Sequence, residues 1–499
     1  MPKSVNNKFG LNYRNTPNIE EYLTYLLRRS LWSDTPTPDL AAILPAPLET
    51  YSFRTGIQPR QLALINIGVA AIGSLGILQP VLTALALSCV FLTLFSALIL
   101  FRLVLVLTGL GLRLLPSPPH VPSALAEDLP TYSILVAAYE EAGMMRQLAD
   151  ALDAVSWPND KLEVFLLLEA GDPETLQAAQ VAGFSDSTRL IIVPPGGPKT
   201  KPNALNHGLA LARGTYVTVY DVEDLPHPDQ LHQSYALFEN APDHTVCVQA
   251  PLVAVNGGSN WIAAQWALEY DVQFGLLLPS LSLHDMPILL GGTSNHFRRE
   301  ALLAAGGWDA WNVTEDADLG IRLARAGLMI ETIPAPTFES APTEFGVWYA
   351  QRSRWLKGYL QTWLVLMRDP ATTLRQMGLV QFLVAQLTLG GAILAPLVHA
   401  PCAALVALAV WSGHLEIGQA GLGLLIAGLG VGLFGDLIAP GRWSWTRLLA
   451  IATRPLYWPL HSLAAYRALW ELANKPFFWA KTPHHPHDAE PRTYYSTGS

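Results

Sequence analysis

The chain has 499 residues, enough for several domains, and its formal net charge is −9. Hydrophobic residues make up 51% of it and charged residues only 14%, a balance that is unusual for a purely soluble protein. An acidic chain lacks the basic surface that broad nucleic-acid binding requires, so no nucleic-acid partner is expected. Cys89, Cys247 and Cys402 lie far apart in the sequence, which argues against a disulfide framework or a zinc site.

A run without any Asp, Glu, Lys or Arg extends from residue 61 to residue 101. Because a transmembrane helix needs about 20 apolar residues, this run predicts two crossings. We expect a hairpin over residues 61–112 with its turn at Gln79-Pro80. Arginines flank both ends of the hairpin, which places residues 1–60 and the middle of the chain on the cytosolic side. Residues 1–60 carry no motif that indicates a function.

Further charge-free runs, at 376–415 and 417–435, predict a second membrane region. We expect about three to four spans within residues 376–470. Residues 451–469 of that region either cross the bilayer or lie in its interface. The remaining residues, 471–499, are expected to form a cytosolic tail.

Between the two apolar regions, residues 131–345 alternate short apolar runs with amphipathic stretches, after a proline-containing linker at 113–130. Expected strands are 132–137, 164–168, 190–193, 216–220 and 246–249, and expected helices are 142–155, 173–182 and 203–212. This alternation predicts an α/β domain with a mostly parallel sheet. In such sheets ligands bind beyond the carboxyl ends of the strands, which is where polar clusters occur in this sequence.

Polar clusters follow the early strands. Glu140-Glu141 comes after the first, and Glu169 to Asp172 after the second. A basic turn at residues 199–203, which includes Lys201, then opens a helix. Lysines oppose the helix dipole at an N-terminus, and an arriving phosphate would remove that conflict. The alternative for this turn is a solvated charged loop.

Asp221 and Glu223 follow the strand expected at 216–220. Residues i and i+2 leaving a strand point the same way, so the two carboxylates can converge. Two hard oxygen ligands beside a phosphate site suit Mg²⁺ or Mn²⁺. A solvated acidic loop is the alternative, and the position at a strand end favours the metal site.

Thr314-Glu315-Asp316 precedes an apolar helical pattern. Thr314 is a natural N-cap, and acidic residues in the first turn complement the helix dipole. The functional alternative is a general base that takes a proton from an attacking hydroxyl.

Gln351, Arg354 and Trp355 stand at i, i+3 and i+4, so a helix would present them on one face. An amide, a guanidinium fork and a flat ring together suit a phosphate oxygen and a stacked sugar. Residues 346–375 are expected to form interfacial helices, because other aromatic residues surround this group just before the apolar run.

These residues resemble membrane-embedded family 2 glycosyltransferases of the cellulose synthase-like type over residues 130–363. The resemblance depends on the order of the four elements described above: the strand end at 136–141, Asp221-x-Glu223, residues 314–316 and Gln351-x-x-Arg354-Trp355. The stretch 291–297 also looks like the acceptor-side loop of the family. The segment 475–482 is similar to the end of a bacterial exopolysaccharide subgroup, often labelled XagB-like.

The resemblance implies an α/β GT-A (Rossmann-like) domain inserted between N- and C-terminal transmembrane helices, and a nucleotide-sugar donor, most often a UDP-sugar. Asp316 would be the catalytic base, with Glu315 and Asp221 beside it, and Asp221 and Glu223 would hold Mg²⁺ or Mn²⁺. The implied donor-binding residues are Glu141, Glu169, Asp172, Lys201 and Asp221, and either Glu169 or Asp172 would bind the uridine. The implied acceptor- and diphosphate-binding residues are Gly292, Thr293, Gln351, Arg354 and Trp355.

The implied activity is inverting transfer to a growing β-linked polysaccharide, processive and coupled to membrane passage. The expected location is a bacterial inner membrane, with the catalytic domain cytosolic and with export or regulatory proteins as further partners. A non-processive transferase acting on a lipid-linked or small acceptor is the alternative. A transporter or inactive scaffold is less favoured, because the long apolar runs hold no Asp, Glu, Lys or Arg of the kind that a transporter uses. Glu223 departs from the family, which usually has a second Asp there.

Overall fold

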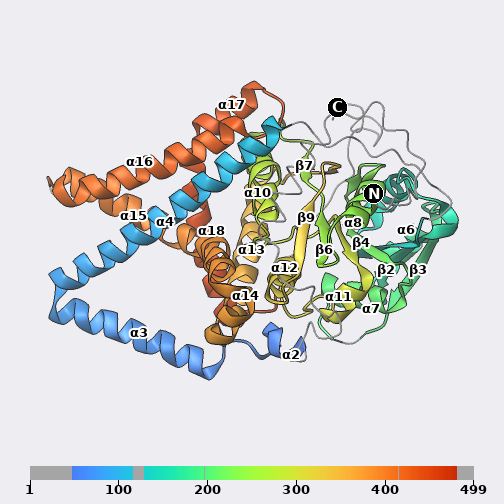
Figure 1. The fold of residues 1–499 in the computed structure, drawn as a ribbon, viewed down its shortest axis with the longest axis horizontal. Coiled ribbons are helices and arrows are strands. Elements are labelled where there is room, and N and C mark those ends of the chain that lie inside the picture. The colour runs from blue at the N-terminus through green and yellow to red at the C-terminus, as the bar shows by residue number, and fades with distance from the viewer. Residues whose placement is uncertain (1–47, 116–128, 196, 414, 480, 482–499) are drawn as a thin grey trace, which may run out of the picture.

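The computed structural model describes residues 48–115, 129–195, 197–413, 415–479 and 481 (Figure 1). Most of the segment expected at 1–60, most of the linker expected at 113–130 and most of the tail expected at 471–499 lie outside the described residues.

A mixed sheet of seven strands organises the α/β domain, in the order β3-β2-β1-β4-β8-β6-β9. Its strands are β1 (Tyr132–Ala138), β2 (Leu162–Glu169), β3 (Thr188–Val193), β4 (Tyr216–Tyr220), β6 (Thr245–Gln249), β8 (Asn295–Arg298) and β9 (Met329–Thr332). β1 to β4 pair in parallel, whereas β8 runs antiparallel to both β4 and β6. The five strands expected from the apolar runs are all present, and β8 and β9 are additional.

A second, three-stranded sheet was not predicted. It consists of β5 (Leu225–Pro226), β10 (Thr337–Glu339) and β7 (Leu252–Ala254), with β10 in the middle. These strands have only two or three residues each, too few for an alternating pattern to appear in the sequence. The small sheet carries Glu339 to the site described below.

Both faces of the large sheet are covered by helices, as a largely parallel sheet requires. Alternate residues of β1 enter different cores: Leu135 packs in one cluster, and Ile134 and Val136 pack in the other. The helices and short helical turns of this domain are α5 (Met145–Asp153), α6 (Pro173–Val181), α7 (Lys201–Leu211), α8 (Gln230–Asn240), α11 (Arg299–Ala304), α12 (Glu315–Arg325), η3 (Ala142–Met144) and η4 (Asn159–Lys161). The three predicted helices are therefore present, with shifted ends.

Four helices in the described ranges are long and apolar enough to cross a membrane. Two of them, α3 (Pro59–Leu78) and α4 (Pro80–Leu114), form the predicted hairpin, and the helix breaks at Gln79 as expected. The other two are Pro370–Trp411 and Gln419–Ile438. The first runs through α14 (Pro370–Ala385), η6 (Gln386–Gly390) and α15 (Gly391–Trp411), and the second lies in α16 (Leu415–Ile438). In Figure 1 these helices extend away from the sheet, with α4 beside α16.

The predicted region 451–469 falls in α17 (Trp445–Ala452) and α18 (Arg454–Asn474). Helix α18 packs along α13 (Phe345–Leu366) and α15, so it lies where the sheet domain meets the apolar helices. The same junction contains α9 (Trp261–Val272), η5 (Gln273–Leu277) and α10 (Leu278–Leu283). A Cβ at Gly109 of α4 would lie 2.7 Å from the carbonyl oxygen of Leu276, so glycine permits this close packing.

The residues just before the hairpin of α3 and α4 are attached to the α/β domain. They form α2 (Leu48–Tyr51) and η2 (Phe53–Thr55). The Ser52 hydroxyl and the Phe53 amide both donate to Asp309, at 2.7 and 2.8 Å. The Arg368 guanidinium donates to backbone carbonyls of the same segment, including Ser52 at 2.9 Å and Gly56 at 3.0 Å. The hairpin is therefore attached to the sheet domain from its N-terminal side as well.

Candidate active site

A cavity of about 1080 Å³ lies at the carboxyl ends of β1, β2 and β4 and continues toward the apolar helices. The predicted site residues that line it are Glu141, Glu169, Lys201, Asp221, Glu223, Gly292, Thr293, Glu315, Asp316, Gln351, Arg354 and Trp355. The structure thus brings together side chains that are separated by up to about two hundred residues, at the sheet edge where α/β proteins bind ligands.

Asp172 is the exception. Its carboxylate accepts from the Thr175 amide at 3.1 Å, which makes it the N-cap of α6. Its other oxygen accepts from the backbone amide of Glu140, which has a positive φ of 53°. Asp172 therefore supports the strained turn after β1 instead of facing the cavity. Of the two acids left open for uridine binding, Glu169 is the one that lines the cavity.

The start of α7 forms the basic wall of the cavity. Lys199, Thr200 and Lys201 all line it, and the Thr200 hydroxyl donates to the Ala310 carbonyl rather than capping its own helix. The Lys201 ammonium forms an ion pair with Asp221 and donates to the Gly292 carbonyl at 2.7 Å. Burial alone would lower the pKa of Lys201, but the nearby charges of Asp221 and Glu315 have the larger effect and raise this pKa. An ammonium group and a helix N-terminus together suit a phosphate.

The loop after β4 presents the two predicted metal ligands. Asp221 and Glu223 both line the cavity, and a cation, the Lys201 ammonium, already lies against Asp221. Within the described ranges no group of three or more His, Cys, Asp or Glu side chains could hold a metal ion. Two carboxylates still fit Mg²⁺ or Mn²⁺, because such ions take their remaining ligands from substrate phosphates and water. The residues present therefore fit the metal that the family implies.

Asp224, which the sequence did not single out, shapes this loop. Its buried carboxylate accepts from the Asp221 amide at 2.7 Å and from the Thr293 hydroxyl. Burial, together with Asp221 and Glu223, raises its pKa well above the ordinary range. The Thr293 hydroxyl, predicted to face the acceptor, thus joins the 291–297 loop to the loop that carries Asp221 and Glu223.

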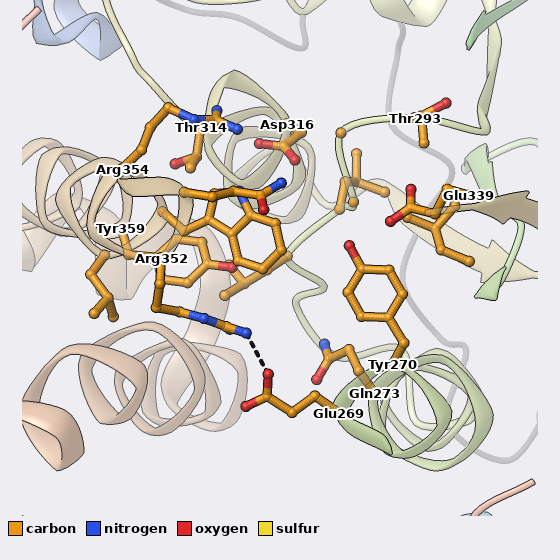
Figure 2. A pocket seen from close by; sticks show the side chains of 18 of the residues that line it. Glu269, Tyr270, Gln273, Thr293, Thr314, Asp316, Glu339, Arg352, Arg354 and Tyr359 are labelled. Atoms are coloured by element: carbon orange, nitrogen blue, oxygen red, sulfur yellow. Dashed lines mark hydrogen bonds and ion pairs between the residues drawn. The ribbon is translucent and has the colours of Figure 1, made fainter. Parts of the chain in front are cut away.

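Asp316 lies in the first turn of α12, next to the cavity (Figure 2). The preceding turn is held by α13: the Val313 amide donates to Gln361 at 3.0 Å, and Asn312 donates to Thr362 at 2.9 Å. Thr314 occupies the predicted N-cap position. The turn that carries Asp316 is therefore held in place by α13.

Glu315 and Asp316 are adjacent acidic residues whose carboxyl groups have little access to water. Burial, and then the neighbouring Asp316, raise the pKa of Glu315 to about 8. Burial also raises the pKa of Asp316. A carboxylate with a raised pKa is a stronger base, as general-base catalysis near neutral pH requires.

Gln351, Arg354 and Trp355 share one face of α13, as predicted, and that face borders the cavity. Arg354 donates to the Val313 carbonyl at 3.2 Å and lies 4.5 Å from the ring of Trp479. The buried Gln351 Oε1 and Arg354 Nε have no hydrogen-bond partner within the described part of the chain. Buried polar atoms are normally paired, so both atoms fit contact with a bound ligand.

The segment 475–481 adds cavity residues that the motifs do not include. Trp479 stacks on Arg354, and Lys481 forms an ion pair with Glu141 at 3.3 Å and donates to the Glu140 carbonyl at 2.6 Å. Only the likeness of this tail to the exopolysaccharide subgroup pointed to it in the sequence. The segment therefore connects the face of α13 with the end of β1.

The far end of the cavity lies among the apolar helices. Its lining there includes Arg102 of α4, Thr388 and Gly391 near the start of α15, and Gly432 of α16. Helix α18 contributes Arg454, Trp458 and His461. Polar, small and apolar side chains therefore line this end together, and the cavity extends from the carboxylate cluster to the long apolar helices.

An α/β sheet of this order, with paired carboxylates after β4 and a buried acid beside a Gln-x-x-Arg-Trp helix, defines a glycosyltransferase of the GT-A fold. Residues 133–296 match glycosyl transferase family 2, and residues 216–470 match the glycosyl transferase family group 2. The second match covers just over half of the chain. The chain belongs to the glycosyl transferase family group 2.

The chain is also similar to individual characterised proteins. It is 28% identical to a β-monoglucosyldiacylglycerol synthase of Trichormus variabilis over 275 residues. The aligned region covers 53% of this chain and 58% of that protein. It is 25% identical to a UDP-forming cellulose synthase catalytic subunit of Komagataeibacter sucrofermentans over 258 residues. That aligned region covers 50% of this chain and 33% of the cellulose synthase subunit. The matches thus span about three-fifths and one-third of these relatives.

A solved structure of a mannosyltransferase from Pyrobaculum calidifontis, in complex with GDP-mannose and Mn²⁺, aligns with a TM-score of 0.48 at 20% identity. The alignment covers 77% of this chain and 99% of the mannosyltransferase.

Proposed function

We propose that this protein is an inverting, metal-dependent glycosyltransferase that moves a sugar from a UDP-sugar to a growing β-linked polysaccharide. In this proposal the catalytic domain is cytosolic, at a bacterial inner membrane, and elongation is processive and coupled to membrane passage. Export or regulatory proteins are proposed as further partners. The observation that carries the proposal is the continuity of the cavity. It reaches from Glu169 and Lys201, through Asp316 and Trp355, to Arg102 and Gly432 among the apolar helices.

The proposed chemistry is a single displacement. Asp316 takes the proton of an acceptor hydroxyl, whose oxygen attacks the anomeric carbon from the face opposite the diphosphate. The bond between that carbon and the diphosphate oxygen breaks, and its electron pair leaves with the nucleoside diphosphate. One new glycosidic bond forms with inverted configuration. Trp355 supports the acceptor ring by stacking, and Arg354 donates to the leaving diphosphate.

Lys201 and the open N-terminus of α7 bind the diphosphate in this scheme, because both favour negative charge. Asp221 and Glu223 are the residues that would hold Mg²⁺ or Mn²⁺. When bound, the metal supplies positive charge that stabilises the departing diphosphate. Glu169 and Glu141 border the end of the cavity where the nucleoside would lie.

A second candidate is single transfer to a lipid or lipid-linked acceptor, with the same displacement chemistry. Two observations support it: the cavity extends among apolar helices, and the chain is similar to the β-monoglucosyldiacylglycerol synthase of Trichormus variabilis. The guanidinium groups of Arg102 and Arg454 and the polar His461 ring at that end favour a hydroxylated glycan over an acyl chain, because burying charged and polar groups against hydrocarbon is costly.

The test is release of nucleoside diphosphate by the purified protein in lipid nanodiscs, with Mg²⁺ or Mn²⁺. The donors are UDP-glucose, UDP-galactose, UDP-N-acetylglucosamine, UDP-glucuronate and GDP-mannose. Turnover of a UDP-sugar that is lost on chelation supports the proposal, and failure of every donor contradicts it. Size analysis of the labelled product separates a polymer from a singly glycosylated lipid that extracts into organic solvent.

Asp316→Asn should abolish turnover while donor binding, measured calorimetrically, stays near that of the wild type. The matched control is Asp318→Asn in the same helix, because Asp318 pairs with the buried Arg322 instead of lining the cavity. The control should lower thermal stability and leave turnover of the folded protein intact. Normal turnover in Asp316→Asn would contradict the assignment of the base.

A further inference from the structure

A second group of charged side chains borders the cavity, apart from the carboxylates of Asp221, Glu223 and Asp316. Glu269 of α9 forms an ion pair with Arg352 of α13, drawn as a dashed line in Figure 2. The same carboxylate accepts from the Tyr457 hydroxyl at 3.0 Å and lies 3.1 Å from His461 Nε2, both on α18. Three helices from distant parts of the chain therefore meet at one carboxylate.

This carboxylate is held firmly in its charged state. Burial alone would raise the pKa of Glu269, but Arg352 and His461 outweigh burial and hold it below the ordinary range. Its neighbour Tyr457 is itself fixed, because it also accepts from the Trp348 indole at 2.8 Å. The ion pair therefore has a fixed position as well as a fixed charge.

Arg352 is enclosed by aromatic rings. Its guanidinium carbon lies 4.9 Å from the ring centre of Trp266 and 4.9 Å from that of Trp355. Trp348 is a little farther, at 5.8 Å. The rings of Trp266 and Trp355 are themselves 4.9 Å apart, at an interplanar angle of 41°. A planar guanidinium stacks on aromatic faces, so Arg352 determines how the Trp355 ring can lie.

We propose that Glu269 is a positioning residue for the acceptor: through Arg352, it fixes the Trp355 ring on which the acceptor sugar stacks. The inference rests on the proposed function, in which Trp355 is the acceptor platform. Arg352 occupies the first unspecified position within the Gln351-x-x-Arg354-Trp355 motif and was not assigned a role, and Glu269 lies more than eighty residues earlier. A tilted Trp355 would let the donor bind normally but misplace the attacking hydroxyl, and water would then attack instead.

The experiment compares wild type with Glu269→Gln in nanodiscs, using the UDP-sugar that the wild type turns over. Two quantities are measured in parallel: nucleoside diphosphate released and labelled sugar incorporated into product. We expect the fraction of turnovers that end in product to fall about ten- to a hundredfold, since a displacement near 1 Å has effects of that size. The KM for the donor should stay unchanged. The matched control is Asp271→Asn, also in α9, which removes an ion pair with Arg447 outside the cavity lining.

The double variant Glu269→Gln, Arg352→Gln separates positioning from stability. Removing both charges should restore much of the Tm that the single variant loses, because no buried charge is then left alone. The fraction of product should nevertheless stay low, since the Trp355 ring has lost its guanidinium partner. Wild-type product yield in Glu269→Gln, or recovery of yield together with Tm in the double variant, would overturn the inference. A wild type that turns over no donor would instead contradict the proposed function.

Discussion

Gly358→Ala is the substitution that most directly tests how α13 holds the catalytic turn. A Cβ built on Gly358 would lie 2.2 Å from Thr314 Oγ1 and 2.7 Å from Thr314 Cβ. Ordinary contact begins at 3.4 Å, so the Cβ–Cβ approach is too short by about 0.7 Å. Because Thr314 Cβ is attached to the backbone, rotation of the side chain leaves this overlap in place. Helix α13 and the turn that carries Asp316 therefore have to separate.

Two opposing effects set the stability of this variant. Alanine favours a helix interior over glycine by about 1 kcal/mol. Overpacking of a tight contact costs about 1–3 kcal/mol, so the free energy of unfolding should fall by about 0–2 kcal/mol. The effect on activity is larger, since a shift approaching 1 Å between Asp316 and the Arg354–Trp355 face lowers kcat/KM by about ten- to a hundredfold.

The assay is nucleoside diphosphate release at saturating metal, with donor affinity measured separately. Gly346→Ala is the matched control, because it is the same change in the same helix and no described atom lies within 4 Å of the new Cβ. The control should keep wild-type kcat/KM. If Gly358→Ala were as active as Gly346→Ala, the turn at Thr314 would not be held by this contact and the reasoning would be refuted.

Three further predictions concern charge. The folded-state pKa of Glu315 is raised to about 8, so the unfolded chain ionises first as pH rises and stability is lost from about pH 4.5 to 8. Glu315→Gln should therefore raise Tm more at pH 8 than at pH 5, and equal gains at both would contradict this sign. Lys201→Met should raise the donor KD about ten- to a hundredfold in titration calorimetry, since it removes a charged contact at the start of α7, and unchanged affinity would remove Lys201 from the diphosphate site. Arg368→Ala should lower the free energy of unfolding by about 1–3 kcal/mol and expose residues 48–58 to limited proteolysis, because four hydrogen bonds to that segment are lost. Unaltered cleavage would show that Asp309 alone holds the segment.

Of the five predicted strands, β1, β2, β4 and β6 are buried along most of their length, which requires a nearly continuous apolar run. The fifth, β3, lies at the sheet edge and is partly exposed, and its apolar residues at 190–193 indicate it. β8 escapes prediction because its His296 is buried through hydrogen bonds with distant partners, to Tyr132 at 2.8 Å and Gln230 at 3.1 Å. No local pattern encodes those contacts. The hairpin of two apolar helices, α3 and α4, was predictable down to its break at Gln79, because a charge-free run of this length is typical of helices that can cross a membrane.

The candidate site likewise contains residues that a local sequence pattern indicates and residues that only folding brings together. Asp221, Glu223 and Asp316 were found because each follows a strand or opens a helix with a recognisable spacing. Asp172 resembled them in the sequence, but its carboxylate caps a helix and supports the left-handed Glu140, a local role that spacing does not distinguish. Glu269 had no signal of its own, because its importance depends on helices that meet only after folding.

The segment 475–481 comes after the last apolar helix, yet Trp479 and Lys481 lie against Arg354 and Glu141 in the cavity. The functional unit is therefore discontinuous, and cutting the chain at the edges of the sheet would not release a complete enzyme. A soluble fragment ending before α13 would keep the loop that carries Asp221 and Glu223 but lose the groups that border the other half of the cavity. For protein engineering this means that a fusion or affinity tag joined near Lys481 would lie beside Glu141 at the mouth of the candidate site.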